Sequence, residues 1–213
     1  NHFIKYVGNV GQELVESIFA FIDYQPIPVT QLVQSNQANT QPEGCINLGW
    51  RGWEGDFPTS VIRECTTNED LDEKIIAFYN GAVRTSTRRL QPLVSYYHQD
   101  PRPEMFAGTA LTGVQAYMGS LIPNLTGSVV FTDFVRKGNT ESPARGVLAY
   151  NRIRTDGKRS DVGMITTNDP FGSESAYYVS LGTNLDQSRI FVGVYGSANV
   201  TDYNQGTVCE IVP

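Results

Sequence analysis

Short strand-like runs separated by turn residues fill most of this chain, and no other feature constrains the possible folds as strongly. The clearest example is 75–84, where the run Ile-Ile-Ala-Phe-Tyr is followed by Asn80-Gly81 and then by Ala-Val-Arg. Asn-Gly between two apolar runs supplies the positive φ angles of a type I′ turn, which joins antiparallel strands. The segment is therefore predicted to form a β-hairpin, and Asp156-Gly157 predicts the tip of a second one.

The same pattern continues along the chain. The segment 13–24 has the length of a short helix, but β-branched and aromatic residues dominate it, and Gly11 and Pro26 bracket it as a strand. We predict strands at 13–24, 28–33, 60–65, 74–79, 93–97, 114–118, 127–136, 146–153, 161–166, 175–180, 190–195 and 207–212. Short strands joined by recurring turns are typical of antiparallel folds. We therefore expect an all-β fold, a single antiparallel β-barrel or sandwich with long decorated loops.

The length and composition allow one substantial core. The chain has 213 residues, of which 40% are hydrophobic, and all-β folds of this size are commonly single domains. No linker-like stretch divides it, so 1–213 is predicted to be one domain. The chain begins at Asn1 without Met and stops at Pro213 in strand-like sequence, which we interpret as excision from a larger polyprotein.

The charge pattern argues against binding to nucleic acid or insertion into a membrane. The formal net charge is −6, and no run of Lys and Arg exceeds two residues, whereas phosphate backbones are bound through clustered cations. No apolar run approaches the roughly 20 residues that span a bilayer, and no secretory signal opens the chain. We expect a soluble module.

The cysteines and the glycosylation sequons leave several alternatives open. Cys45, Cys65 and Cys209 allow at most one internal disulfide and do not decide the redox compartment, and all three can equally be small buried hydrophobes. Sequons begin at Asn124 and Asn199, which would accept glycans only in a chain that enters the secretory pathway.

No recognisable catalytic, metal or cofactor site is present in the sequence. The two histidines, His2 and His98, are too few for a His-based metal cluster, and no Gly-x-Ser-x-Gly or phosphate-binding Gly motif occurs. His98 is either a base oriented by Asp100 or another acid, or an exposed loop imidazole beside two prolines, which is the interpretation we favour. The acidic run 69–73 lacks the EF-hand order, so a solvated turn or one short helical turn is expected there. We predict a protein that is not an enzyme and needs no cofactor.

Both tryptophans of the chain fall within a Gly-rich stretch, which is the strongest candidate for a binding site. Trp50, Arg51 and Trp53 lie in Gly-Trp-Arg-Gly-Trp-Glu-Gly-Asp-Phe-Pro. Indole faces stack on sugar rings and side chains, and an Arg provides forked hydrogen bonds. We predict that these three residues contact a ligand or receptor; the alternative is that the tryptophans anchor a long loop to the core.

A second candidate is the basic patch that follows the Asn80-Gly81 hairpin. It contains Arg84, Arg88 and Arg89, which can meet an acidic glycan or partner. On a strand, however, Arg84 and Arg88 would share one face and Arg89 the other, so an ordinary solvated face is equally consistent. Eleven tyrosines favour a protein interface, because Tyr buries its ring while keeping its hydroxyl paired. We expect a homodimer.

The opening stretch 3–24, Phe-Ile-Lys-Tyr-Val-Gly-Asn-Val-Gly-Gln-Glu-Leu-Val-Glu-Ser-Ile-Phe-Ala-Phe-Ile-Asp-Tyr, resembles the start of an astrovirus capsid spike domain. The size and the acidic, Tyr-rich composition are similar as well. The resemblance implies a β-rich spike with a barrel-like core, paired into dimers on the virion surface, which binds a host-cell receptor (glycan or protein) and antibodies. It assigns no role to any particular residue.

Two other classes of function remain alternatives. One is a carbohydrate-binding or glycoside hydrolase β-sandwich, in which Glu54 and Asp56 work with a further carboxylate; such pairs stand about 5 to 10 Å apart across a cleft. The other is a purely structural oligomerisation module that buries its tryptophans. The exposure of Trp50 and Trp53 distinguishes a recognition loop from the structural module.

Overall fold

The computed structural model describes residues 3–12, 14–23, 48–50, 53–55, 57–58, 92–98, 107–136, 143–152, 162–168, 170–197, 199 and 201–213. Within these ranges the chain forms strands and one 3₁₀ helix, η2 (Pro123–Leu125). The strands are β1 (Phe3–Asn9), β2 (Val15–Asp23), β3 (Trp53–Glu54), β4 (Phe57–Pro58), β5 (Val94–Tyr97), β6 (Leu111–Tyr117), β7 (Ser128–Asp133), β8 (Val147–Arg152), β9 (Val162–Met164), β10 (Tyr177–Thr183), β11 (Ile190–Tyr195) and β12 (Gly206–Ile211). The predicted all-β fold is confirmed.

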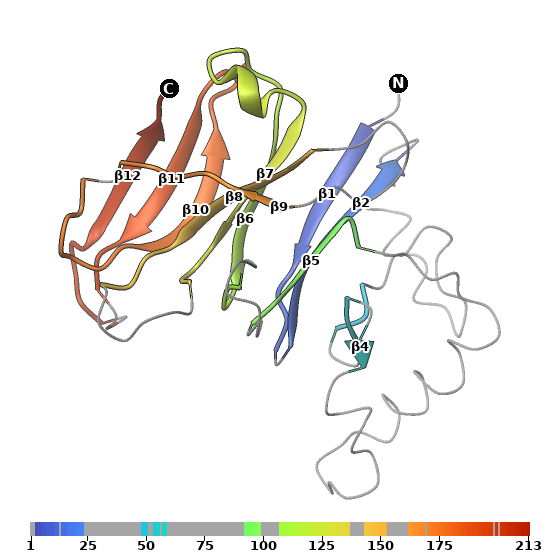
Figure 1. The fold of residues 1–213 in the computed structure, drawn as a ribbon, viewed down its shortest axis with the longest axis horizontal. Helices are drawn as coiled ribbons and strands as arrows, with labels where there is room; N and C mark the ends of the chain where they lie inside the picture. The colour runs from blue at the N-terminus through green and yellow to red at the C-terminus, as the bar shows by residue number, and fades with distance from the viewer. Residues whose placement is uncertain are drawn as a thin grey trace, which may run out of the picture.

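The described strands form three antiparallel sheets and one short ribbon (Figure 1). The N-terminal sheet has the order β1-β2-β5, the central sheet β6-β7-β8-β9, and the C-terminal sheet β10-β11-β12. The ribbon consists of β3 and β4. None of the described sheets closes into a barrel, so the sandwich is the correct one of the two architectures expected.

The central sheet is the middle layer of the sandwich, because both of its faces are covered. Val129 and Phe131 of β7 pack in one core with Ile18 and Tyr96 of the N-terminal sheet. The residue between them, Val130, packs in a second core with the C-terminal sheet. Successive side chains of a strand point to opposite faces, so β7 contributes to two cores at once. Figure 1 shows the C-terminal, central and N-terminal sheets from left to right.

The sequence of β7 explains why it occupies this position. All six of its residues, Ser-Val-Val-Phe-Thr-Asp, are buried. A strand with polar residues on alternate positions would leave one face in water, whereas this run is apolar on both faces and β-branched, as buried strands are. Its neighbour β8 alternates in the same way, with Val147 and Ala149 in the first core and Leu148 in the second.

Nine of the predicted strands coincide with observed ones, with shifts at their ends. The match covers β2 and all strands from β5 to β12; the largest shifts are three residues, at the start of β6 and at the ends of β7 and β10. The sequence did not indicate β1, which pairs with β2 from Phe3↔Asp23 to Asn9↔Ser17. The predicted strands 28–33, 60–65 and 74–79 lie outside the described residues, as do the tips at Asn80-Gly81 and Asp156-Gly157.

The structure also bears on the expectations for the cysteines and for membrane-spanning segments. Cys209 is a free, partly buried thiol on β12, while Cys45 and Cys65 lie outside the described residues. Among the described residues, no helix has the length and apolar character needed to cross a membrane.

Candidate functional site

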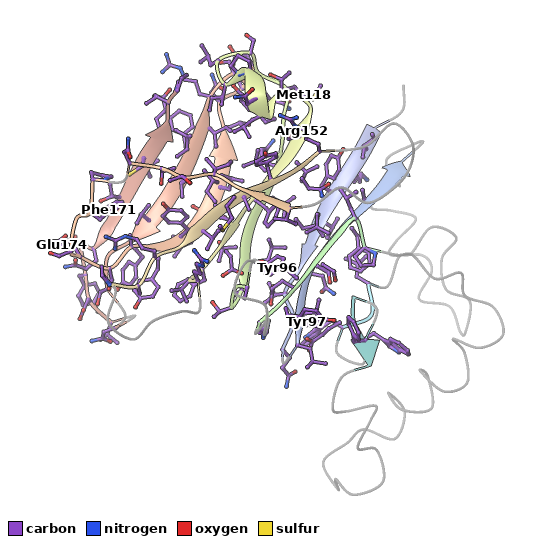
Figure 2. The ribbon with its side chains drawn as sticks, in the orientation of Figure 1. Tyr96, Tyr97, Met118, Arg152, Phe171 and Glu174 are labelled. Carbon is purple, nitrogen blue, oxygen red and sulfur yellow. The ribbon has the colours of Figure 1, made fainter. Side chains whose placement is uncertain are left out.

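Four aromatic residues lie on the ribbon, on the turn before it and on the adjacent strand β5, and we call them the aromatic patch: Trp50, Trp53, Phe57 and Tyr97. Trp50 is 56% exposed, Phe57 38% and Tyr97 37%, whereas Trp53 is partly buried. The rings of Phe57 and Tyr97 are tilted against each other with their centroids 5.7 Å apart. Figure 2 shows Tyr97 beside the ribbon, and the preceding Tyr96 nearer the central sheet.

A tight turn presents Trp50 to solvent. The backbone N–H of Trp53 donates to the carbonyl oxygen of Gly49 over 2.9 Å, and Gly49 has a φ of +102°. A Cβ atom at Gly49 would lie 2.9 Å from Cβ of Trp53. Glycine is required there for both its φ and its size, so the local sequence favours the turn that carries Trp50.

The ribbon lies directly on the outer face of the N-terminal sheet. Its turn residue Gly55 has a φ of +55°, and a Cβ atom there would be 2.8 Å from the hydroxyl oxygens of both Ser17 and Ser95. These serines face each other across β2 and β5. Only a residue without a side chain permits this approach, which brings Phe57 onto Tyr97.

A buried carboxylate holds the ribbon in place. The Glu54 side chain is 0% exposed; Oε1 accepts from the N–H of Gln12 over 2.9 Å, and Oε2 accepts from Leu14 over 2.8 Å and Val15 over 3.0 Å. Hydrogen bonds to an ionised acceptor are the strong ones and offset the cost of burying a carboxylate. Glu54 therefore joins the ribbon to the connection between β1 and β2.

The buried position of Glu54 argues against its role in the glycoside hydrolase alternative. A general acid or nucleophile must reach the substrate, but Glu54 is enclosed and hydrogen-bonded to three backbone groups. Its proposed companion Asp56 lies outside the described residues. In the described part of the chain, no three His, Cys, Asp or Glu side chains are grouped so as to hold a metal ion.

His98 is not the exposed loop imidazole that we expected. Its side chain is 13% exposed, and its Nε2 lies 2.6 Å from Oε1 of Glu16, which is 0% exposed. Glu16 also accepts the N–H of Gly11 on Oε1 over 3.0 Å and the N–H of Leu111 on Oε2 over 2.8 Å. The expectation was wrong because a carboxylate buried in β2 requires polar partners, and His98 at the end of β5 is one of them. Asp100 is outside the described residues.

A third buried carboxylate joins the central sheet to β5. The phenol of Tyr96 donates to Oδ2 of Asp133 over 2.7 Å. Asp133 also accepts backbone N–H bonds from Thr109 and Val135 on Oδ1 and from Ala110 on Oδ2. Burial raises the pKa of Asp133 although these hydrogen bonds act in the opposite direction. Burial, followed by the adjacent Asp133, raises the pKa of Tyr96 far above its ordinary value.

The three carboxylates of Glu16, Glu54 and Asp133 have a common role. Each accepts backbone N–H groups from segments next to strand ends, and such groups must be satisfied when they are buried. The arrangement is a set of structural anchors, which the sequence analysis missed. The available signal was an acidic residue within an apolar strand run, as in Val-Glu-Ser-Ile-Phe and Val-Val-Phe-Thr-Asp.

The structure brings together only part of the predicted binding site. Trp50 lies in the turn that leads into the ribbon, and Trp53 begins the ribbon. The structure adds a contact between Phe57 of the ribbon and Tyr97 of β5. Arg51 and the second patch, Arg84, Arg88 and Arg89, lie outside the described residues.

Comparison of the chain with protein-family models, with curated protein sequences and with solved structures found no match. Function is therefore inferred from the residues and their geometry.

Proposed function

We propose that this chain is a non-enzymatic recognition module that binds a host-cell receptor through the aromatic patch. One observation carries the proposal: Trp50 is 56% exposed on a turn whose ribbon is held by the buried Glu54 carboxylate. An indole fixed in water by a rigid support is a typical binding anchor, because little conformational freedom remains to be lost on binding.

The chemistry of the patch suits a glycan or a protein side chain. Flat aromatic faces stack on the apolar face of a sugar or on another ring, and the adjacent Arg51 would supply hydrogen bonds to hydroxyl or carboxylate groups. Contacts of this kind are individually weak, so display of many copies would provide avidity. Arg84, Arg88 and Arg89 stay a second proposed contact region.

We further propose that the module is a capsid spike of the astrovirus type, displayed on the virion surface and exposed to antibodies. The resemblance of 3–24 and the all-β fold support this assignment. The same proposal includes a homodimer, for which the eleven tyrosines are the motivation. Light scattering at tens of micromolar tests the dimer, and a strict monomer there would contradict it.

The test of the binding site is Trp50→Ala, measured by cell attachment and on a glycan array. Loss of a central aromatic anchor costs about 2 kcal/mol of binding free energy, which corresponds to a Kd about thirtyfold weaker. Stability should change by no more than about 0.5 kcal/mol, because the side chain is largely in water. Tyr203→Ala is the matched control, since Tyr203 is 87% exposed between β11 and β12. Unchanged attachment by a folded Trp50→Ala protein would show that the aromatic patch is not the receptor site.

A further inference from the structure

Two loops contact each other at the end of the molecule opposite the aromatic patch. They are 118–122, between β6 and η2, and 184–189, between β10 and β11. The phenol of the buried Tyr117 donates to the carbonyl oxygen of Ser188 over 3.1 Å and accepts the N–H of Ile122 over 3.1 Å. Figure 2 labels Met118 at this upper end and Tyr97 at the lower end of the described sheets.

Close packing confirms that the two loops form one surface. A Cβ atom added at Gly119 would lie 2.7 Å from the carbonyl oxygen of Gln187 and 2.7 Å from the phenol oxygen of Tyr117. Thr126 stabilises the first loop, because its hydroxyl donates to the carbonyl oxygen of Gly119 over 2.6 Å. The backbones are therefore in contact, and their positions are coupled.

These loops expose three large aliphatic side chains, which we call the apical patch: Met118, Leu121 and Leu185. Their exposed fractions are 64% for Met118, 51% for Leu121 and 103% for Leu185. One exposed aliphatic residue is ordinary on a protein surface, whereas several on adjoining loops mark an interaction site. Methionine also adapts its shape to different partners.

Leu185 is presented by a loop that is already ordered. The N–H of Gln187 donates to the carbonyl oxygen of Asn184 over 3.0 Å. The Asn184 side chain accepts the N–H of Arg189 over 2.8 Å and donates to the Ser188 hydroxyl over 2.9 Å. Gln187 has a φ of +58°, a conformation that costs energy for a residue with a side chain and persists only where the surroundings enforce it.

A fixed negative charge lies next to Leu185. Oδ1 of Asp186 accepts the N–H of Ser188 over 2.9 Å, and hydrogen bonds from Ser188 lower the pKa of Asp186, so the carboxylate stays ionised at neutral pH. The charge of Arg189 also lowers the pKa of Asp186, but Arg189 lies 3.5 Å from Glu210 as well, so one cation serves two carboxylates. On the side of η2, Arg152 donates to the carbonyl oxygen of Asn124 and lies over the Tyr150 ring. The tip at Leu185 is therefore apolar and acidic.

We propose that the apical patch docks a protein segment in which an apolar side chain stands next to a Lys or Arg. Leu185 and Met118 cover the apolar side chain, while Asp186 pairs with the cation. This surface is separate from the aromatic patch and does not depend on the proposed receptor site.

The acidic tip favours a protein over a lipid surface. Insertion of Leu185 into a bilayer would carry the ionised Asp186 into the headgroup region, and burial of an unpaired charge is costly. The net charge of −6 adds repulsion from anionic lipids. A basic residue on a protein partner removes both the cost of burying the Asp186 charge and the electrostatic repulsion.

The test is selection from a phage-displayed library of random linear peptides on the immobilised chain, followed by fluorescence anisotropy with the selected peptides. We expect sequences that combine an apolar residue with Lys or Arg. Leu185→Ser should weaken binding about tenfold, and Asp186→Asn about threefold with a smaller dependence on salt. Val208→Ser is the matched control, because Val208 is 72% exposed on β12, where it pairs with Gly193 of β11 and not with a residue of the 184–189 loop; neither it nor Trp50→Ala should change the affinity.

Several results would overturn the proposal. They are the absence of any enriched peptide, equal binding to the original chain and to Leu185→Ser, and enrichment without basic residues together with no effect of Asp186→Asn. Cosedimentation with phosphatidylcholine or phosphatidylserine vesicles that depends on Leu185 would assign the patch to lipid. Self-association that Leu185→Ser abolishes would assign it to a second copy of the chain. Thermal melting of each variant verifies that the fold is intact.

Discussion

The two layers that flank the central sheet are joined to it by different polar groups. The C-terminal sheet meets it through a core of Val, Ile, Leu, Ala and Tyr side chains, and its hydrogen bonds to the central sheet come from neutral groups, such as the Thr112 hydroxyl that donates to the carbonyl oxygen of Tyr178. The N-terminal sheet shares a similar core, but its polar ties use buried carboxylates, from Glu16 to Leu111 and from Tyr96 to Asp133. All three buried carboxylates among the described residues lie on this side.

The stability of the N-terminal layer should therefore depend more strongly on geometry and on pH. Apolar burial is non-directional and tolerates small movements, whereas a buried carboxylate is stabilised only while its hydrogen bonds are all formed. The aromatic patch lies on the N-terminal sheet, so the layer that carries the proposed receptor site is also the one held by buried carboxylates. The following experiments compare the two layers.

The largest effect is expected for Glu16→Ala. The substitution leaves buried N–H groups of Gly11 and Leu111 without their acceptor and removes the partner of His98. Breaking such a buried pair costs about 4 kcal/mol. Urea denaturation measures the change in the free energy of unfolding. Glu16→Gln, which keeps the volume and one acceptor, should lose less; an equal loss would show that the charge and second acceptor of the carboxylate matter and that the volume of the side chain does not.

Ile190→Ala probes the opposite layer. Ile190 is 0% exposed in the second core, and removal of its side chain should cost about 3 kcal/mol through lost burial and the cavity left behind. Because no ionisable group is involved, the loss should be the same in mild acid and in mild alkali. A strong dependence of this loss on pH would contradict the contrast between the layers.

Tyr96→Phe gives the smallest change at neutral pH and the clearest change with pH. Loss of the bond to Asp133 should cost about 1.5 kcal/mol. The pKa of Tyr96 is raised in the folded chain above its ordinary value of 10.0, so its stabilisation is complete below pH 10 and is lost as the pH rises further. Tyr96→Phe should reduce that alkaline loss, as measured by thermal melting at a series of pH values. Some slope should remain, because burial also raises the pKa of Tyr6; an unchanged slope would exclude Tyr96 as its source.

Strands with a strong local pattern were the predictable part of the fold. The apolar run of β7 and the alternation of β11 identify strands without reference to any other segment. β1 was missed because Lys5, Gly8 and Asn9 interrupt its pattern. The glycine at position 8 is explained only by the packing of β1 against β6, since a Cβ atom there would lie 2.6 Å from the Leu111 side chain.

In the candidate site, too, only the residues that are close in the sequence were predictable. Trp50 and Trp53 stand out within a Gly-rich stretch, but Phe57 and Tyr97 join them only through the docking of the ribbon on β5. The environment of His98 was predicted wrongly, because its partner Glu16 is distant in the chain.

The all-β character, the positions of most strands and the Gly-rich turn around Trp50 follow from the sequence alone, because alternation of side chains and the backbone freedom of glycine act over a few residues. Tertiary packing sets the exposure of Trp50, the covering of both faces of the central sheet, the anchoring role of Glu16, Glu54 and Asp133, and the contact between the loops that carry Met118 and Leu185. These features depend on contacts between segments far apart in the chain, where burial and hydrogen bonding are set by the packing of sheets rather than by neighbouring residues.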